Sequence, residues 1–140
     1  MIKVTHIKTP QEMDLAYEIR RIVFIQEQNV PEAEEYDDLD NQAIQFLLWK
    51  NQEAIGTARF RTVDGWGKLE RIAILKAHRG EGNGKTLVQA ILKYADITGI
   101  QHLKLSSQTY AVPFYEKLGF IARGEIYLDA NIEHRDMFKE

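Results

Sequence analysis

The most informative segment, residues 69 to 85, reads Leu69-Glu70-Arg71-Ile72-Ala73-Ile74-Leu75-Lys76-Ala77-His78-Arg79-Gly80-Glu81-Gly82-Asn83-Gly84-Lys85. A strand pattern leads into a glycine-rich turn, and an amphipathic helix pattern follows from about Lys85 to Thr98. Glycines let the backbone come close to a ligand, while the first amides of a helix lack partners within the helix and favour an anion. A strand, turn and helix in this order suit a phosphate-binding site. The alternative is a turn whose glycines serve packing alone.

The spacing of this turn argues against the two common nucleotide motifs. A P-loop requires a glycine five positions before Gly84, and that position is Arg79. The dinucleotide fingerprint requires a longer gap before its last glycine than Gly80, Gly82 and Gly84 provide. A phosphate bound here therefore belongs to another class of site.

Hydrophobic patterning on either side of the turn predicts one α/β domain over residues 1–140, without repeats or linkers. Thr9, Pro10 and Glu12 predict a helix start with a capping box. The first strands follow one another as hairpins and the later ones alternate with helices, so we expect a mixed central sheet with helices on both faces. Strands are expected at residues 2–7, 43–49, 54–63, 68–75, 102–106 and twice within 120–139, and helices at residues 10–24, 85–98 and 111–118.

The composition is that of a soluble globular protein, with 44% apolar and 28% charged residues. A net charge of −3 argues against nonspecific binding to nucleic acid, and no apolar run is long enough to cross a bilayer. The chain has no cysteine, which excludes disulfides and thiolate chemistry. His6, His78 and His102 lack the spacing of metal ligands. We therefore expect a cytoplasmic protein that uses no metal.

Two motifs carry a resemblance to a known family. Arg79-x-x-Gly82-x-Gly84 matches motif A, the pyrophosphate-binding signature of the GNAT N-acetyltransferase superfamily. The stretch Ala111-Val112-Pro113-Phe114-Tyr115-Glu116-Lys117-Leu118-Gly119-Phe120 is similar to motif B of the same family. Residues 20–31 and the acidic segment after them resemble a bacterial ElaA- or YjcF-like subgroup, so the resemblance covers nearly the whole chain. It implies a GNAT-type acyl-CoA N-acyltransferase fold and transfer of an acetyl group from acetyl-CoA to an amine.

The resemblance also implies where acetyl-CoA binds. The cofactor would lie where strands 69–75 and 102–106 splay apart, with its pantetheine arm paired to the first strand as an added strand would be. Its pyrophosphate would meet the amides of the glycine turn. The implied cofactor-binding residues are Ile72, Ala73 and Ile74 of the strand, Arg79, Gly80, Glu81, Gly82, Asn83, Gly84 and Lys85 of the turn, and Gln108 and Tyr115 further along the chain.

Direct attack of an amine on a thioester needs a base for the amine and an acid for the leaving thiolate. Tyr115 matches the family position that supplies this acid, and its alternative role is packing. Glu70 lies close to where some relatives carry a catalytic glutamate; otherwise it is a strand charge that pairs with Arg71 or Lys68. His134, on the final strand, would line the acceptor side and could relay protons at neutral pH, although a lone histidine is more often structural.

An acidic segment marks the expected acceptor side. No lysine or arginine stands between Arg21 and Lys50. Mutual repulsion of the acidic groups costs stability unless something offsets it, so we expect the segment to attract a cationic small-molecule or protein amine. A solvated loop without a ligand is the alternative. The acidic residues are Glu32, Glu34, Glu35, Asp37, Asp38 and Asp40.

Two functions stay open on the sequence alone. An N-acetyltransferase is favoured because Tyr115 and candidate bases are present, and a non-catalytic module that senses acetyl-CoA or a nucleotide is the alternative. The acceptor, the length of the acyl group and the choice between monomer and homodimer also stay open.

Overall fold

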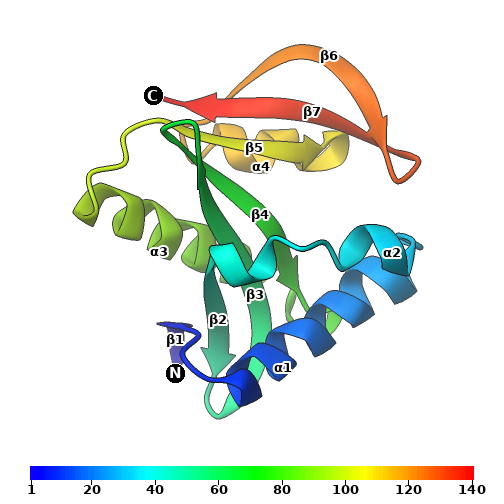
Figure 1. Ribbon diagram of the computed structural model, residues 1–140, viewed down its shortest axis with the longest axis vertical. Helices are drawn as coiled ribbons and strands as arrows, with labels where there is room; N and C mark the ends of the chain where they lie inside the picture. The colour runs from blue at the N-terminus through cyan, green and yellow to red at the C-terminus, as the bar shows by residue number, and fades with distance from the viewer.

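The computed structural model describes all 140 residues, Met1–Glu140, and a seven-stranded sheet forms its centre (Figure 1). The strands are β1 (Ile2–His6), β2 (Ile44–Lys50), β3 (Glu53–Val63), β4 (Trp66–Ile74), β5 (Leu103–Gln108), β6 (Ile121–Asp129) and β7 (Ile132–Lys139). Their order across the sheet is β1-β2-β3-β4-β5-β7-β6. Every neighbouring pair is antiparallel except β4 and β5, which are parallel.

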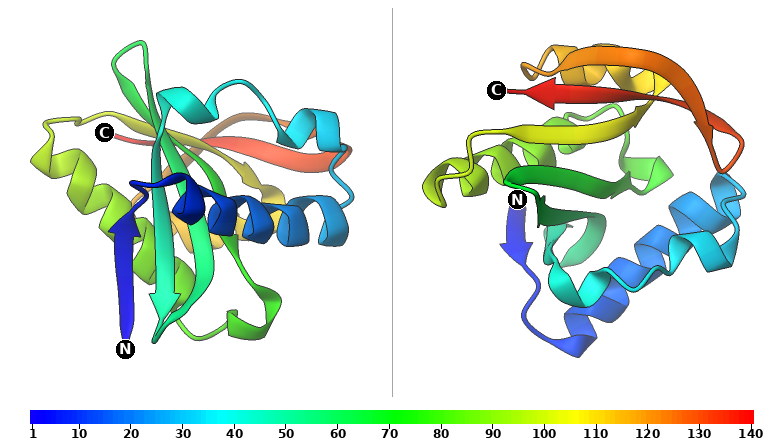
Figure 2. Two further views of the ribbon diagram at one scale, coloured as in Figure 1. Left: turned by 60° about the horizontal axis from the view of Figure 1, so that its bottom comes forward. Right: turned by 45° about the horizontal axis from the view of Figure 1, so that its top comes forward.

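Helices cover both faces of this sheet (Figure 2). They are α1 (Pro10–Arg20), its π-helical continuation η1 (Arg21–Glu27), α2 (Glu32–Glu35), α3 (Asn83–Ile97) and α4 (Val112–Glu116), with 3-10 turns η2 (Asp40–Gln42), η3 (Lys76–His78) and η4 (Thr109–Ala111). On β2, Phe46 and Leu48 pack in the cluster that holds α3, whereas Leu47 packs with α1. Successive residues of a strand point to opposite faces, so α1 and α3 lie on opposite sides. The predicted mixed sheet with helices on both faces is confirmed.

The first helix begins as predicted and continues differently. Thr9 Oγ1 accepts a hydrogen bond from the Glu12 amide at 3.1 Å, and Glu12 Oε1 accepts one from the Thr9 amide at 3.2 Å, which completes the capping box. From Arg21 the helix widens into π-helical turns, whereas the sequence predicts an uninterrupted α-helix to Phe24. A 3.6-residue pattern carries no signal for this widening, and π-helical turns often mark functional sites.

The sheet opens between its two parallel strands. Pairing of β4 with β5 runs only from Gly67 and Leu103 to Leu69 and Leu105, and both strands continue well beyond the last pair. β4 also carries a bulge, in which Arg71 has φ 53°. A residue other than glycine rarely adopts this left-handed conformation. The bulge bends β4 at the point where the sheet opens.

The remaining predicted elements are present with shifted ends. The helix predicted at 85–98 begins at Asn83, and the strand predicted at 102–106 runs from Leu103 to Gln108. The two expected C-terminal strands meet at the expected turn. None of the helices has both the length and the apolar character needed to span a membrane.

Candidate active site

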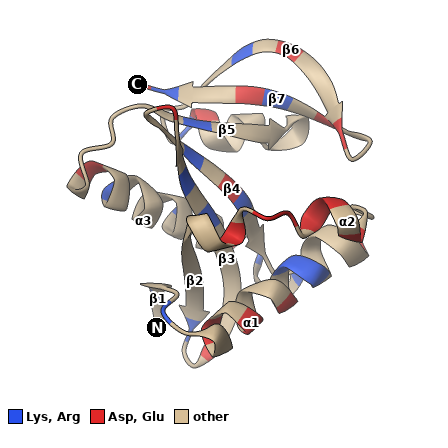
Figure 3. Cartoon of the chain, viewed as in Figure 1, with Lys and Arg blue, Asp and Glu red and all other residues tan.

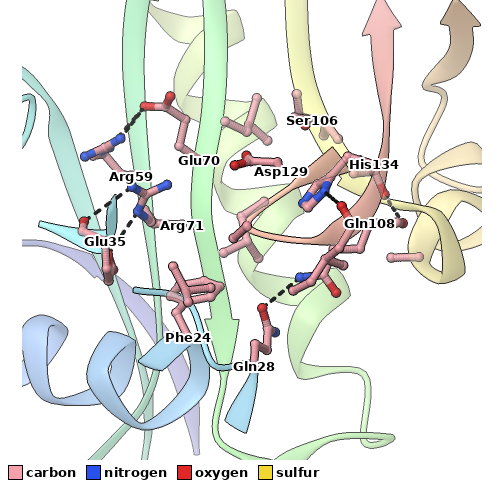
Figure 4. Close-up of a pocket in the computed structure, with 18 of the residues that line it drawn as sticks. Phe24, Gln28, Glu35, Arg59, Glu70, Arg71, Ser106, Gln108, Asp129 and His134 are labelled. Carbon is pink, nitrogen blue, oxygen red and sulfur yellow. Dashed lines mark hydrogen bonds and ion pairs between the residues drawn. The ribbon is translucent and has the colours of Figure 1, made fainter. Parts of the chain in front are cut away.

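A cavity of about 380 Å³ opens where β4 and β5 separate (Figure 4). Its walls come from both strands, from η1 and α2, from α4, and from the turn between β6 and β7. The sheet therefore brings together segments that are far apart in the sequence. Of the predicted site residues, those that line this cavity are Glu70, Ile72, Gln108, Tyr115 and His134.

The glycine turn follows the C-terminal end of β4 and leads into α3. Gly80 and Gly82 have φ values of 81° and 83°, and a Cβ on either would meet no atom within 4 Å. The backbone conformation, and not crowding, is therefore what requires glycine here. α3 begins at Asn83 without a side-chain cap, so the amides of its first turn have no partner within the helix. Free amides at the positive end of a helix fit the pyrophosphate of an acyl-CoA.

Side chains of the turn hold it in shape. The Arg79 Nε donates to the Ile74 carbonyl at 2.8 Å, and its guanidinium pairs with Glu27 at 2.9 Å. Asn83 is buried, and its Nδ2 donates to the His78 carbonyl at 2.9 Å. Both contacts fix the path between β4 and α3. Of the other predicted cofactor residues, Ala73 is buried against α1, Glu81 pairs with Lys50 and Lys85 is exposed.

Tyr115 lies on α4 and packs between two phenylalanines. Its ring centroid is 5.0 Å from that of Phe114 and 6.0 Å from that of Phe120, both edge to face. Burial, with a smaller effect of Tyr110, raises the pKa of Tyr115 above its ordinary value of 10.0. No hydrogen bond from another residue offsets this shift. The hydroxyl therefore stays protonated at neutral pH and remains available to a partner in the cavity.

His134 reaches the cavity from β7. Its Nδ1 lies 2.7 Å from the Ile132 carbonyl oxygen, a contact that fits a proton on Nδ1 and leaves Nε2 as an acceptor. The imidazole also stacks on Tyr127, with centroids 6.0 Å apart. Gln108 pairs with His134 across β5 and β7, and its Nε2 donates to Gln28 Oε1 at 2.8 Å. That bond joins β5 to the end of η1 across the cavity (Figure 4).

Glu70 is surrounded by cations. Its Oε1 accepts hydrogen bonds from Arg59 Nε at 3.0 Å and from Arg61 Nε at 2.6 Å, and Lys68 lies 3.4 Å from Oε2. Burial alone would raise the pKa of Glu70, but the hydrogen bond from Arg61 and the charge of Arg59 lower it overall. A carboxylate held as an anion is a weak proton acceptor. These surroundings argue against Glu70 as the base, and of its two expected partners only Lys68 is present.

The acidic segment is coloured red over α2 and the chain that follows it in Figure 3. Half of its carboxylates form ion pairs with arginines. Arginines from three other elements offset the repulsion among these groups. Burial would raise the pKa of Asp37, yet hydrogen bonds from Arg59 and from the Leu39 amide lower it to about 2. The pairs are Glu35 with Arg20 at 2.6 Å and with Arg71 at 3.2 Å, Asp37 with Arg59 at 2.7 Å, and Asp40 with Arg20 at 2.7 Å and with Arg59 at 3.2 Å.

Sequence reasoning gave no role in the cavity to Arg71, which braces the acidic segment, or to Asp129, which enters from the turn between β6 and β7. Of these two residues, only the position of Asp129 could have been predicted from the sequence. It precedes a two-residue turn, so strand alternation puts it on the same face as His134.

Comparison with known proteins identifies the family. A family model described as an acetyltransferase (GNAT) domain matches residues 11–140. The chain belongs to the GNAT acetyltransferase family. It is 39% identical over 140 residues to the uncharacterized N-acetyltransferase YjcF of Bacillus subtilis (strain 168), a match that covers 99% of this chain and 100% of YjcF. It is 32% identical over 134 residues to the protein ElaA of Escherichia coli (strain K12), covering 88% of this chain and 84% of ElaA.

Solved structures agree with this assignment. The crystal structure of Escherichia coli ElaA matches with a TM-score of 0.87 at 26% identity and covers both chains completely. A putative N-acetyltransferase from Lactobacillus plantarum matches with a TM-score of 0.91 at 26% identity, covering 99% of this chain and 97% of that one. The GNAT fold and the ElaA/YjcF-like resemblance are confirmed. The protein is therefore an acyltransferase of a family that takes its acyl group from acyl-CoA.

Proposed function

We propose that this GNAT protein transfers an acetyl group from acetyl-CoA to a primary amine by direct attack, with Tyr115 as the general acid and His134 as the proton acceptor. One observation carries the proposal. A protonated phenol on α4 and an imidazole nitrogen on β7 both face the cavity, and neither is engaged by another residue there. These are the two proton-transfer groups that amine attack on a thioester requires.

The placement of acetyl-CoA follows from the open part of the sheet. Beyond Leu69, the edge of β4 that faces β5 has no strand partner, so residues 72–74 offer backbone groups to the pantetheine arm. The amides of Gly82, Asn83 and Gly84 would receive the pyrophosphate at the start of α3. An arm laid along β4 between these points would bring the thioester to the cavity that Tyr115 lines.

His134 and Tyr115 account for the two proton transfers of this reaction. As the amine nitrogen bonds to the thioester carbon, His134 Nε2 accepts the proton that the nitrogen loses. As the carbon–sulfur bond breaks, the Tyr115 hydroxyl protonates the sulfur and yields the CoA thiol. The raised pKa of Tyr115 keeps this donor protonated until charge develops on sulfur. His134 then releases its proton to water and Tyr115 regains one, so the net products are the amide, the CoA thiol and one proton per ammonium consumed.

The variant Tyr115→Phe tests this assignment, because it keeps the ring and removes only the hydroxyl. Turnover should fall by about 10²-fold, the usual effect of losing a general acid, while affinity for acetyl-CoA should hardly change. Tyr36→Phe is the matched control, since Tyr36 is an exposed phenol outside the cavity. Single-turnover rates give the comparison. A rate near that of the wild type in Tyr115→Phe, with chemistry limiting, would leave Tyr115 as a packing residue.

A further inference from the structure

The hairpin of β6 and β7 places a carboxylate, Asp129, on the cavity face that carries His134. Its turn residues, Ala130 and Asn131, have φ values of 52° and 63°, as the two-residue turn that suits the twist of a hairpin requires. Asp129 and Ile132 flank this turn as a cross-strand pair, and His134 lies two residues beyond Ile132. Side chains of a cross-strand pair share a face, as do alternate residues of one strand. Asp129, Ile132 and His134 accordingly all line the cavity.

Asp129 differs from the arginine-paired carboxylates of the same cavity. Arginine side chains donate hydrogen bonds to Glu35, Asp37 and Glu70. The Asp129 carboxylate forms neither an ion pair nor a hydrogen bond within the protein, and it points across the cavity toward β4 (Figure 4). Glu34 also lines the cavity without an ion pair, but it lies on α2, away from the hairpin. Only Asp129 combines an unpaired negative charge with a position on the His134 face.

We propose that Asp129 binds the ammonium group of the acceptor before His134 takes its proton. This inference rests on the proposed amine acetylation. Alkylamines are cations at neutral pH, so a partner-free carboxylate at the cavity wall would select them and hold the nitrogen within reach of the imidazole. Transfer of this first proton to Nε2, and from there to water, ends the charge attraction and leaves a neutral nitrogen free to attack. Nε2 is then free to accept the second proton as the amide bond forms. The acceptor-binding carboxylate thus belongs to the hairpin turn, and cationic alkylamines are the acceptor class.

Two amines of equal length test the role of charge. Butylamine is a cation at pH 7.5, whereas O-propylhydroxylamine, in which oxygen replaces one methylene, is neutral. Asp129→Asn should raise the KM for butylamine about five- to twentyfold, as expected for loss of one partly solvated charge-assisted hydrogen bond. The KM for O-propylhydroxylamine should stay unchanged. Glu125→Gln is the matched control, because Glu125 is an exposed carboxylate on the same hairpin outside the cavity.

A binding measurement keeps this test independent of turnover. Saturation-transfer NMR should show butylammonium bound to the wild-type protein loaded with CoA, and Asp129→Asn should weaken that binding by a similar factor. Equal KM changes for both amines, or no change for butylamine in either measurement, would overturn the role of Asp129. Absence of CoA release by the wild-type protein with every amine would instead contradict the proposed function, and the NMR comparison would still decide whether Asp129 binds the cation.

Discussion

Glu35→Gln is expected to destabilise the protein strongly, although it removes one charge from a crowded acidic segment. The Glu35 side chain is 0% exposed and that of its partner Arg20 is 1% exposed. Breaking a buried ion pair from one side costs about 3–5 kcal/mol. Glutamine keeps one acceptor oxygen and Arg20 keeps Asp40 at 2.7 Å, so we expect a loss of about 2–3 kcal/mol. For a chain of this length, the loss corresponds to a fall in Tm of roughly 6–12 °C.

The neighbouring variant Glu34→Gln is the control for this measurement. Glu34 is exposed and forms no ion pair. The free energy of unfolding of the Glu34→Gln protein should therefore stay within about 0.5 kcal/mol of that of the wild type. Urea unfolding of the three proteins, followed by circular dichroism at one pH and salt concentration, gives the comparison. If Glu35→Gln unfolds at the wild-type urea concentration, or at a higher one because repulsion is relieved, the network does not stabilise the segment.

Two further outcomes follow from charged groups elsewhere. Glu27→Gln should strengthen CoA binding about two- to fivefold in calorimetry, because it releases the Arg79 guanidinium from an ion pair of modest strength; unchanged affinity would show that Arg79 does not reach the pyrophosphate. The free energy of unfolding should fall as the pH drops from about 4 to about 2. Folding lowers the pKa of Asp37 from 3.8 to about 2, so its ionised carboxylate stabilises the protein above pH 3.8, and this contribution is lost as the pH falls through the folded-state pKa. Asp37→Asn should flatten that fall in acid titration, and an identical slope in both proteins would rule out this contribution.

Local patterns made most of the fold predictable. The capping box at Thr9, the alternation of the strands and the glycine turn at residues 79–84 each encode their structure within a few residues. No local sequence pattern predicts the bulge in β4. Arg71 adopts a positive φ in a place where the sequence shows no glycine, and the conformation accompanies contacts with a distant segment. Hydrophobic periodicity does not reveal tertiary contacts of this kind.

The site was predictable only in part for the same reason. The family resemblance implied roles for Tyr115 and Gln108, and both line the cavity. It could not show that Arg59 and Arg61 would surround Glu70, because cross-strand neighbours depend on register, which a bulge shifts here. The ion pairing of the acidic segment was not predictable for a related reason: the segment contains no cation of its own, and its counterions come from α1, β3 and β4.

Acetylation of amines in the cavity between β4 and β5, and not mere binding of acetyl-CoA, is the proposed activity. The most direct measurement follows CoA thiol and product mass together while the wild-type protein and acetyl-CoA are mixed with a panel of primary alkylamines. We expect thiol release that depends on the amine, matched mole for mole by N-acetylated product. Tight binding of acetyl-CoA in calorimetry, with no thiol release above the rate of hydrolysis for any amine, would contradict this proposal and favour a sensor of acetyl-CoA.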